Sequence, residues 1–308
     1  MSNSNTKKKS DLVILEMPAQ AELFIVETPI QDWPIKDDIS SMEYPIFSLS
    51  KKRDTRIRTY SRGGKTIRII PSVVGAATVF DQDILIYCIS QLVKAADKNL
   101  AVSRRIKISV TPFLLGTHRS KGGASYVRII DMCRRLKGTT IETNIKSNEL
   151  ERIEGFGLIE DYRVTQYTKN QKGALELEIT ISEWLYRAAL DFDILTLAPG
   201  YFDIGQAMER RLYTLGRKHC GERPWFSIGL PLLKEKIGSA QSASQFKKDI
   251  SNIIKNNRLP EYHLALDTLT NPNQVIYFSR DHKKVFLEAT KTGKINWVHR
   301  LLQRHLGI

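Results

Sequence analysis

The sequence predicts an α+β protein that contains two tandem winged-helix domains. One order of elements occurs twice along the 308 residues: helix, strand, short helix, turn, helix and then β-rich segments. A basic hairpin precedes the first copy, and the chain carries 47 Lys and Arg against 33 Asp and Glu. The repeated order is typical of winged helices, and the excess positive charge favours a polyanionic partner.

The composition narrows the class of protein and of partner. Hydrophobic residues make up 42% of the chain and charged residues 26%, which is ordinary for a soluble globular protein. The formal net charge of +14 favours nucleic acid. An anionic membrane surface is the alternative, but the sequence has no apolar run long enough to span a bilayer and no signal-peptide pattern. We expect a cytoplasmic protein that contacts no membrane.

The cysteines and histidines lack the spacing of a metal site. The three cysteines lie far apart without a CxxC pair, as expected in a reducing compartment: Cys88, Cys133 and Cys220. The six histidines are scattered, and no two have a spacing that suggests a shared metal. We therefore expect neither a metal nor a cofactor.

The beginning of the chain predicts a leader and a short motif. Residues 1–11 are mostly Ser, Asn, Thr and Lys, so we expect residues 1–20 to form a disordered leader. The motif Gln20-Ala21-Glu22-Leu23-Phe24 follows and is similar to peptides that dock on the bacterial sliding clamp. Gln20, Leu23 and Phe24 are its candidate partner-binding residues. In the alternative interpretation, Leu23, Phe24 and Val26 pack as a strand on the first domain.

The first domain, residues 21–195, opens with the basic hairpin. Alternation in 55–60 and 66–70, on either side of a turn at 62–65, predicts two strands. Residues 51–68 include eight basic residues and one acidic residue, so Arg56 and Arg58 are candidate phosphate contacts. The alternative is a solvated surface without a partner.

The first copy of the repeat follows the hairpin. We expect a helix at 81–97, a strand at 105–110, and a short helix capped by Thr111 with Pro112 at its first position. A turn at 118–123 precedes a helix that ends at Gly138. β-rich segments at 139–145, 158–167 and 175–181 then predict a sheet or wing.

The second copy forms the predicted C-terminal domain, residues 196–280. Its expected elements are a helix at 204–219, a strand at 225–228, a short helix at 231–237, a helix at 242–257, and a hairpin of 263–269 with 274–278. Residues 191–201, with a Pro-Gly pair, are the candidate boundary between the domains. Residues 281–308 are expected to form a basic amphipathic helical tail.

The helix at 242–257 is the predicted DNA-reading helix. Ala243, Phe246, Ile250 and Ile253 fall on one face, and polar side chains fall on the opposite one. A helix in the major groove needs this division, because one side packs on the core while the other contacts bases and phosphates. The alternative is an ordinary wet surface. The candidate DNA-binding residues here are Gln241, Ser244, Gln245, Lys247, Lys248, Ser251, Asn252, Lys255 and Arg258.

The corresponding helix of the first copy is less clearly divided. Arg119, Lys121 and Arg128 near its start are candidate phosphate contacts. Its outer face also carries Val127 and Asp131, and an acid facing phosphate is unfavourable. A protein interface is the open alternative for this face.

Several segments, in order, resemble the plasmid replication initiator protein A family. The resemblance runs from about residue 23 to 278. It implies a protein that binds repeated sites at a plasmid origin, opens the duplex locally and recruits the host initiator, helicase and sliding clamp. It also implies that monomers and dimers exchange. The segments are Met42 to Lys51, Asp54 to Arg56, Ile70 to Ser72, Asp83 to Leu92, Gly122-Gly123 with Tyr126, and Leu136 to Thr139.

Three other functions compete with initiation. A rolling-circle enzyme needs a His-hydrophobe-His metal pair, and an ATPase needs a phosphate-binding Gly-x-x-x-x-Gly-Lys-Ser/Thr loop. Neither pattern occurs in the chain, so we expect no enzymatic activity. A winged-helix transcriptional repressor, which can include repression of its own promoter, is the remaining alternative.

Overall fold

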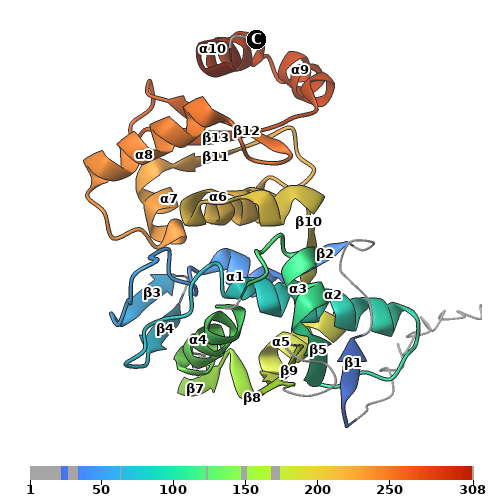
Figure 1. Ribbon diagram of the computed structural model, residues 1–308. Helices are drawn as coiled ribbons and strands as arrows, with labels where there is room; N and C mark the ends of the chain where they lie inside the picture. The colour runs from blue at the N-terminus through green and yellow to red at the C-terminus, as the bar shows by residue number, and fades with distance from the viewer. Residues whose placement is uncertain are drawn as a thin grey trace, which may run out of the picture.

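The computed structural model describes residues 22–26, 34–62, 64–122, 124–146, 151–167 and 174–306. Figure 1 shows two stacked halves, an N-terminal half up to residue 197 and a C-terminal half from residue 198. Helices and sheets are mixed in both, so the predicted α+β class is confirmed. No helix in these described ranges is long and apolar enough to cross a membrane.

One sheet of the N-terminal half carries the first repeat. Its strand order is β1-β5-β9-β8. The strand β1 (Phe24–Val26) runs parallel to β5 (Arg105–Ser109), which is antiparallel to β9 (Leu175–Ile181), and β9 pairs with β8 (Ile159–Gln166). Four helices belong to this unit: α2 (Gln82–Asp97), α3 (Val110–Gly116), α4 (Ser125–Lys137) and α5 (Glu183–Leu190). The predicted order of helix, strand, helix, helix and hairpin is therefore present.

Two local details of this unit differ from the expectation. The short helix α3 begins at Val110 after Ser109, so Thr111 is inside its first turn and is not the cap. Helix α4 does end at Gly138, but the φ of Gly138 is −83°, which any residue can adopt. A side chain there would instead collide with the hydroxyl of Ser72. The glycine is needed for this close approach.

The basic hairpin belongs to a second sheet. The strands β3 (Arg58–Arg62) and β4 (Lys65–Pro71) pair as predicted, and β4 also pairs with β6 (Thr139–Lys146). β6 in turn pairs with β7 (Glu151–Gly157), a strand that the sequence analysis missed. Ile69 and Ile141 face each other and are buried, which anchors the hairpin on the core. The hairpin is thus one edge of a four-stranded sheet.

A small junction joins the two halves. The strand β2 (Ile35–Asp38) is antiparallel to β10 (Ile194–Leu197), and the helix α1 (Ile39–Glu43) packs against α6 (Ala207–His219) of the C-terminal half. A 3-10 helix, η2 (Pro199–Asp203), precedes α6. It ends at Ile204, which is why α6 starts three residues later than expected.

The C-terminal half follows the second predicted order. After α6 come β11 (Trp225–Gly229), α7 (Leu230–Ile237), α8 (Ala243–Asn256), β12 (Tyr262–Asp267) and β13 (Gln274–Ser279). The three strands form one sheet in the order β11-β13-β12. Alternate side chains of the sheet, such as Leu264 and Tyr277, enter the main core.

The predicted tail is the third layer of this half. Residues 281–306 form two helices, α9 (His282–Lys291) and α10 (Ile295–Leu306). Val285 of α9 and Leu301 of α10 are buried against Ile276 and Phe278 on the other face of the sheet. The segment is helical as expected, but it is packed as part of the C-terminal half and is not a separate tail.

Candidate nucleic-acid interface

Helix α8 has one buried side and one exposed side, as the sequence indicates. Phe246, Ile250, Ile253 and Ile254 are at most 6% exposed, and the helix packs on α7 and β12. The Ser242 side chain caps its N-terminus by accepting a hydrogen bond from the Gln245 N–H. Ala243, expected on the buried side, is exposed in the first turn.

The opposite side is the outer face of α8. At 100° per residue, Lys248, Asn252 and Lys255 lie roughly opposite Ile250 and Ile254. The side chains of Lys248, Asn252 and Lys255 are exposed, and Ser251 next to them is half-buried. The face is defined by Ser244, Gln245, Lys247, Lys248, Ser251, Asn252 and Lys255, and Arg258 is exposed just beyond its end.

An acid at the rim of this face fixes two of the predicted residues. The Gln245 Nε2 donates to one carboxylate oxygen of Asp249 at 2.7 Å, and the Gln241 Nε2 donates to the other at 2.8 Å. The Ser239 hydroxyl also donates to the Gln241 Oε1. Asp249 therefore orients both amides at the start of α8. Asp249 was not among the predicted site residues, although its i, i+4 spacing from Gln245 was a usable signal.

The two predicted arginines of the hairpin segment have different roles. Arg56 is 61% exposed and forms a two-pronged ion pair with the buried Asp54. Arg58 instead donates to the carbonyl oxygens of Pro45 and Ile46, at 3.0 and 2.8 Å. Burial lowers the pKa of Arg58. Arg56 keeps an exposed guanidinium beside Asp54, whereas the Arg58 guanidinium braces the backbone.

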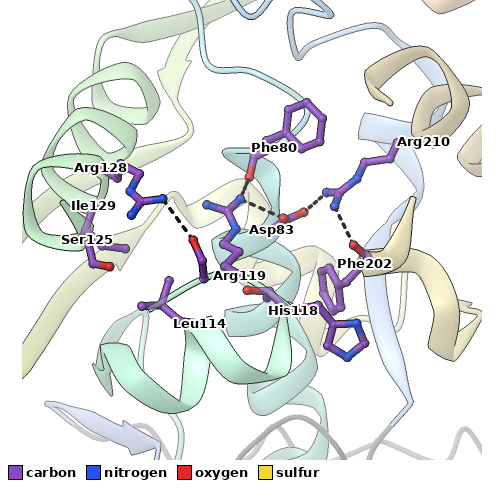
Figure 2. A pocket seen from close by; sticks show the side chains of 12 residues that line it. Phe80, Asp83, Leu114, His118, Arg119, Ser125, Arg128, Ile129, Phe202 and Arg210 are labelled. Carbon is purple, nitrogen blue, oxygen red and sulfur yellow. Dashed lines mark hydrogen bonds and ion pairs between the residues drawn. The ribbon is translucent and has the colours of Figure 1, made fainter. Parts of the chain in front are cut away.

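The three predicted basic residues around the start of α4 also have different surroundings. Figure 2 shows Arg119 pointing toward the buried Asp83. The two side chains pair at 2.8 Å. Asp83 also pairs with Arg210 of the C-terminal half. The predicted phosphate contact at Arg119 is therefore occupied by a buried carboxylate. Lys121, just before α4, and Arg128, in the first turn of α4, are both exposed.

Two hollows lie where the two halves meet, and the exposed basic residues beside them, Lys51, Arg56 and Arg128, are called the basic path. A groove of about 660 Å³ is lined by Gln241 from the start of α8 and by Lys51 and Arg56 from the N-terminal half. The Lys51 ammonium lies 5.7 Å from the centre of the Phe80 ring. Phe80 in turn lines the neighbouring pocket of about 300 Å³ that contains Arg128. No pattern in the sequence places these surfaces beside one another.

Close packing holds this path together at the turn before α8. Gly238 ends α7 with φ +76°, which favours glycine. A side chain there would lie 2.7 Å from Pro45 and 3.2 Å from the Tyr60 hydroxyl, both in the N-terminal half. The end of α7, which leads into the turn before α8, therefore sits directly against the hairpin segment.

The strand interpretation accounts for the described part of the short N-terminal motif. Phe24 packs against the core, Val26 is 7% exposed, and both belong to β1. Leu23 is half-buried just before the strand. Gln20 lies outside the described residues. A clamp contact through Phe24 would require β1 to leave its partner β5.

The described residues contain no group of three or more His, Cys, Asp or Glu side chains arranged to hold a metal ion. All three cysteines are buried as free thiols. Burial raises the pKa of each thiol, so they are inert core side chains.

Mild acid should destabilise the C-terminal half through His263. Its Nδ1 lies 2.8 Å from the Asn257 Oδ1, at the left-handed residue that ends α8. Burial, with the charges of Arg280 and His282, lowers the pKa of His263 to about 4. Below about pH 6.5 His263 becomes protonated in the unfolded chain but stays neutral in the folded chain. The free energy of unfolding therefore falls toward pH 4.

The variant His263→Gln should reduce this pH dependence by up to one proton, as measured by urea unfolding at pH 7.5, 6 and 5. Part of the dependence should remain, because burial also lowers the pKa of His219 to about 4. An unaltered pH profile in His263→Gln would contradict the assignment.

Comparisons with known proteins agree on one family. A model of the family described as Replication initiator protein A matches residues 36–264. A protein of Wigglesworthia glossinidia brevipalpis, described as "Putative replication protein", is 37% identical over 270 residues, which cover 87% of this chain and 97% of that protein.

Two solved structures of RctB domains 2 and 3 share the fold. The first has a TM-score of 0.58 and 14% identity and covers 79% of this chain and 96% of that structure. The second has a TM-score of 0.54 and 14% identity, with coverage of 78% and 97%. The family match spans most of the chain, including α4 and α8. This chain belongs to the replication initiator protein A family.

Proposed function

We propose that this chain initiates plasmid replication by binding repeated double-stranded sites at the origin, without a catalytic site of its own. The observation that carries the proposal is the outer face of α8, which offers amides, hydroxyls and ammonium groups from a helix whose other side is buried. Membership of a replication initiator family supports the same role.

Helix α8 would enter the major groove. The amide of Asn252 can form a bidentate pair with adenine, and Lys248 can reach guanine. Gln245 is held ready by Asp249, which reduces the entropy lost when it meets a base. Lys255 and Arg258 near the end of the helix would contact phosphates.

The basic path extends this contact across the molecule. Lys51 and Arg56 line the same groove as Gln241, and Lys51 also lies over Phe80 of the pocket beside α4. Lys121 and Arg128 continue it on the N-terminal half. One duplex following this path would be held by both halves at once, which favours long direct repeats over short isolated sites.

Opening of the duplex and recruitment of the host initiator and helicase are the further steps of the proposal. The sequence has no ATP-binding loop, so the energy for unwinding would come from the recruited helicase. The motif at residues 20–24 would contact the sliding clamp only if β1 is released. The proposed place of action is the cytoplasm, as a monomer in exchange with a dimer.

Footprinting on the DNA that flanks this reading frame tests the proposal. Several evenly spaced direct repeats would support initiation, and the frame with this DNA should then maintain a replicon that lacks its own origin. A single inverted repeat over a promoter would favour the transcriptional repressor instead. Failure to bind any duplex at low salt would exclude both functions.

The salt dependence of binding should report the Arg56 contact. We expect Arg56→Ala to lower the slope of log affinity against log salt by about 0.9 without changing site preference, because one phosphate contact is lost. Arg58 is unsuitable for this test because it braces the backbone. Arg187→Ala is the matched control, since Arg187 is also exposed and paired with an acid. An equal slope in Arg56→Ala and the parent chain would make the hairpin a solvated surface.

A further inference from the structure

Helix α10 presents a polar stripe that the proposed function does not use. Its residues recur at i, i+3, i+4, i+7 and i+8, so they lie along one side of the helix. All five are exposed and together line a shallow groove of about 500 Å³. The α10 stripe consists of Asn296, His299, Arg300, Gln303 and Arg304.

The stripe is positively charged and has no acid of its own. From residue 289 to 308 the sequence has four Lys or Arg and neither Asp nor Glu. The neighbouring acid, Asp267, is 3% exposed and accepts a hydrogen bond from the Trp297 Nε1 at 2.9 Å. Arg300 covers it at 3.3 Å and remains 45% exposed. Asp267 therefore fixes α10 in place without facing outward.

The position of α10 relates the stripe to the DNA-reading helix. Helix α10 contacts both α8 and β12. The Arg304 Nη1 lies 3.4 Å from the hydroxyl of Thr268, in the loop that links β12 to β13. Figure 1 shows α9 and α10 at the end of the molecule farthest from the N-terminal half, beyond α8. The family match ends at residue 264, so both helices lie outside it.

We propose that the α10 stripe binds the sugar-phosphate backbone of the duplex beside the segment that α8 reads. This inference rests on the proposed function. All five side chains can donate hydrogen bonds, which suits phosphate oxygens. The groove has no apolar lining residue, whereas a protein interface normally has an apolar core. Nucleic acid is therefore the partner that the stripe fits.

Two duplexes of different length test the inference. One carries only the segment protected by α8, and the other extends beyond it on the α10 side. We expect Gln303→Ala with Arg304→Ala to weaken binding of the long duplex about tenfold, because a charged hydrogen bond to phosphate is lost. Binding of the short duplex should be unchanged. Arg304→Glu should weaken the long complex further, since it adds repulsion.

The controls separate this inference from the proposed function. Arg163→Ala removes an exposed arginine from β8 in the N-terminal half and should affect neither duplex. Thermal unfolding of each variant checks that α10 remains packed. Parent-like binding of the long duplex by Arg304→Glu would overturn the inference, as would an equal loss on both duplexes.

Loss of replication with parent-like DNA binding would assign the stripe to a protein partner and would also overturn the inference. The proposed function fails separately, if Lys248→Ala with Asn252→Ala leaves specific binding of both duplexes intact.

Discussion

Replacing Lys248 and Asn252 with alanine is expected to remove most of the specific DNA binding, at about 1 to 3 kcal/mol for each lost base contact. Both side chains project from the centre of the outer face of α8 and are exposed. The buried side of the helix, including Phe246 and Ile250, is untouched, so the fold should be retained. Fluorescence anisotropy with a specific and a scrambled duplex measures the effect.

The matched control removes one ammonium and one amide elsewhere. Lys98 and Gln166 are both exposed in the N-terminal half, away from the basic path. Lys98→Ala with Gln166→Ala should keep the ratio of specific to non-specific affinity. If the Lys248 and Asn252 variant keeps that ratio as well, α8 does not read the sequence.

Replacing Asp83 with alanine is expected to lower the free energy of unfolding by about 3 to 5 kcal/mol, the usual cost of removing one partner from a buried ion network. The Asp83 side chain is 1% exposed and pairs with Arg119 and Arg210. Burial raises the pKa of Asp83, and the two guanidinium groups oppose that rise. Without the carboxylate, Arg210, whose side chain is 4% exposed, would remain charged without an acid partner.

Urea unfolding of Asp83→Ala measures this loss. Asp131→Ala is the control, because Asp131 is 44% exposed and forms only a surface pair with Arg134. Adding Arg210→Met to Asp83→Ala should recover part of the stability, since it removes the unpaired buried charge. A loss in Asp83→Ala no larger than that in Asp131→Ala would mean that the network does not hold the halves together.

Local sequence patterns predicted the helices more accurately than the strands that depend on distant partners. The apolar spacing of Phe246, Ile250 and Ile253 identified α8 almost to the residue, because the division into two faces is written in the helix itself. The strand β7 was missed, because its sequence is charged and contains two glycines. It is a strand because β6 lies beside it. Such pairing depends on residues distant in sequence.

The arginines show where sequence reasoning about the site ends. Arg56, Arg58 and Arg119 look alike in the sequence, and all three were predicted to contact phosphate. Their surroundings separate them: Arg58 meets backbone carbonyls and Arg119 meets Asp83. Both partners are supplied by tertiary packing, which no local pattern reports.

The sequence of the C-terminal strands already contained a signal for the packing of α9 and α10. Residues 262–266 and 275–278 are apolar or aromatic almost without alternation, apart from His263. Strands of this kind are covered on both faces. The pattern therefore already indicated that something must pack on the far side of the sheet, and α9 and α10 are that cover.

The pairing of β2 with β10 fixes the place where the chain passes into the C-terminal half. Because Ile35 is opposite Leu197 and Asp38 is opposite Ile194, the strand that leads out of the N-terminal half is paired along its whole length. The connection to the C-terminal half therefore starts from a hydrogen-bonded strand and not from a flexible linker. If both halves contact one duplex as proposed, this connection would fix the spacing and the helical phase between the two stretches of DNA.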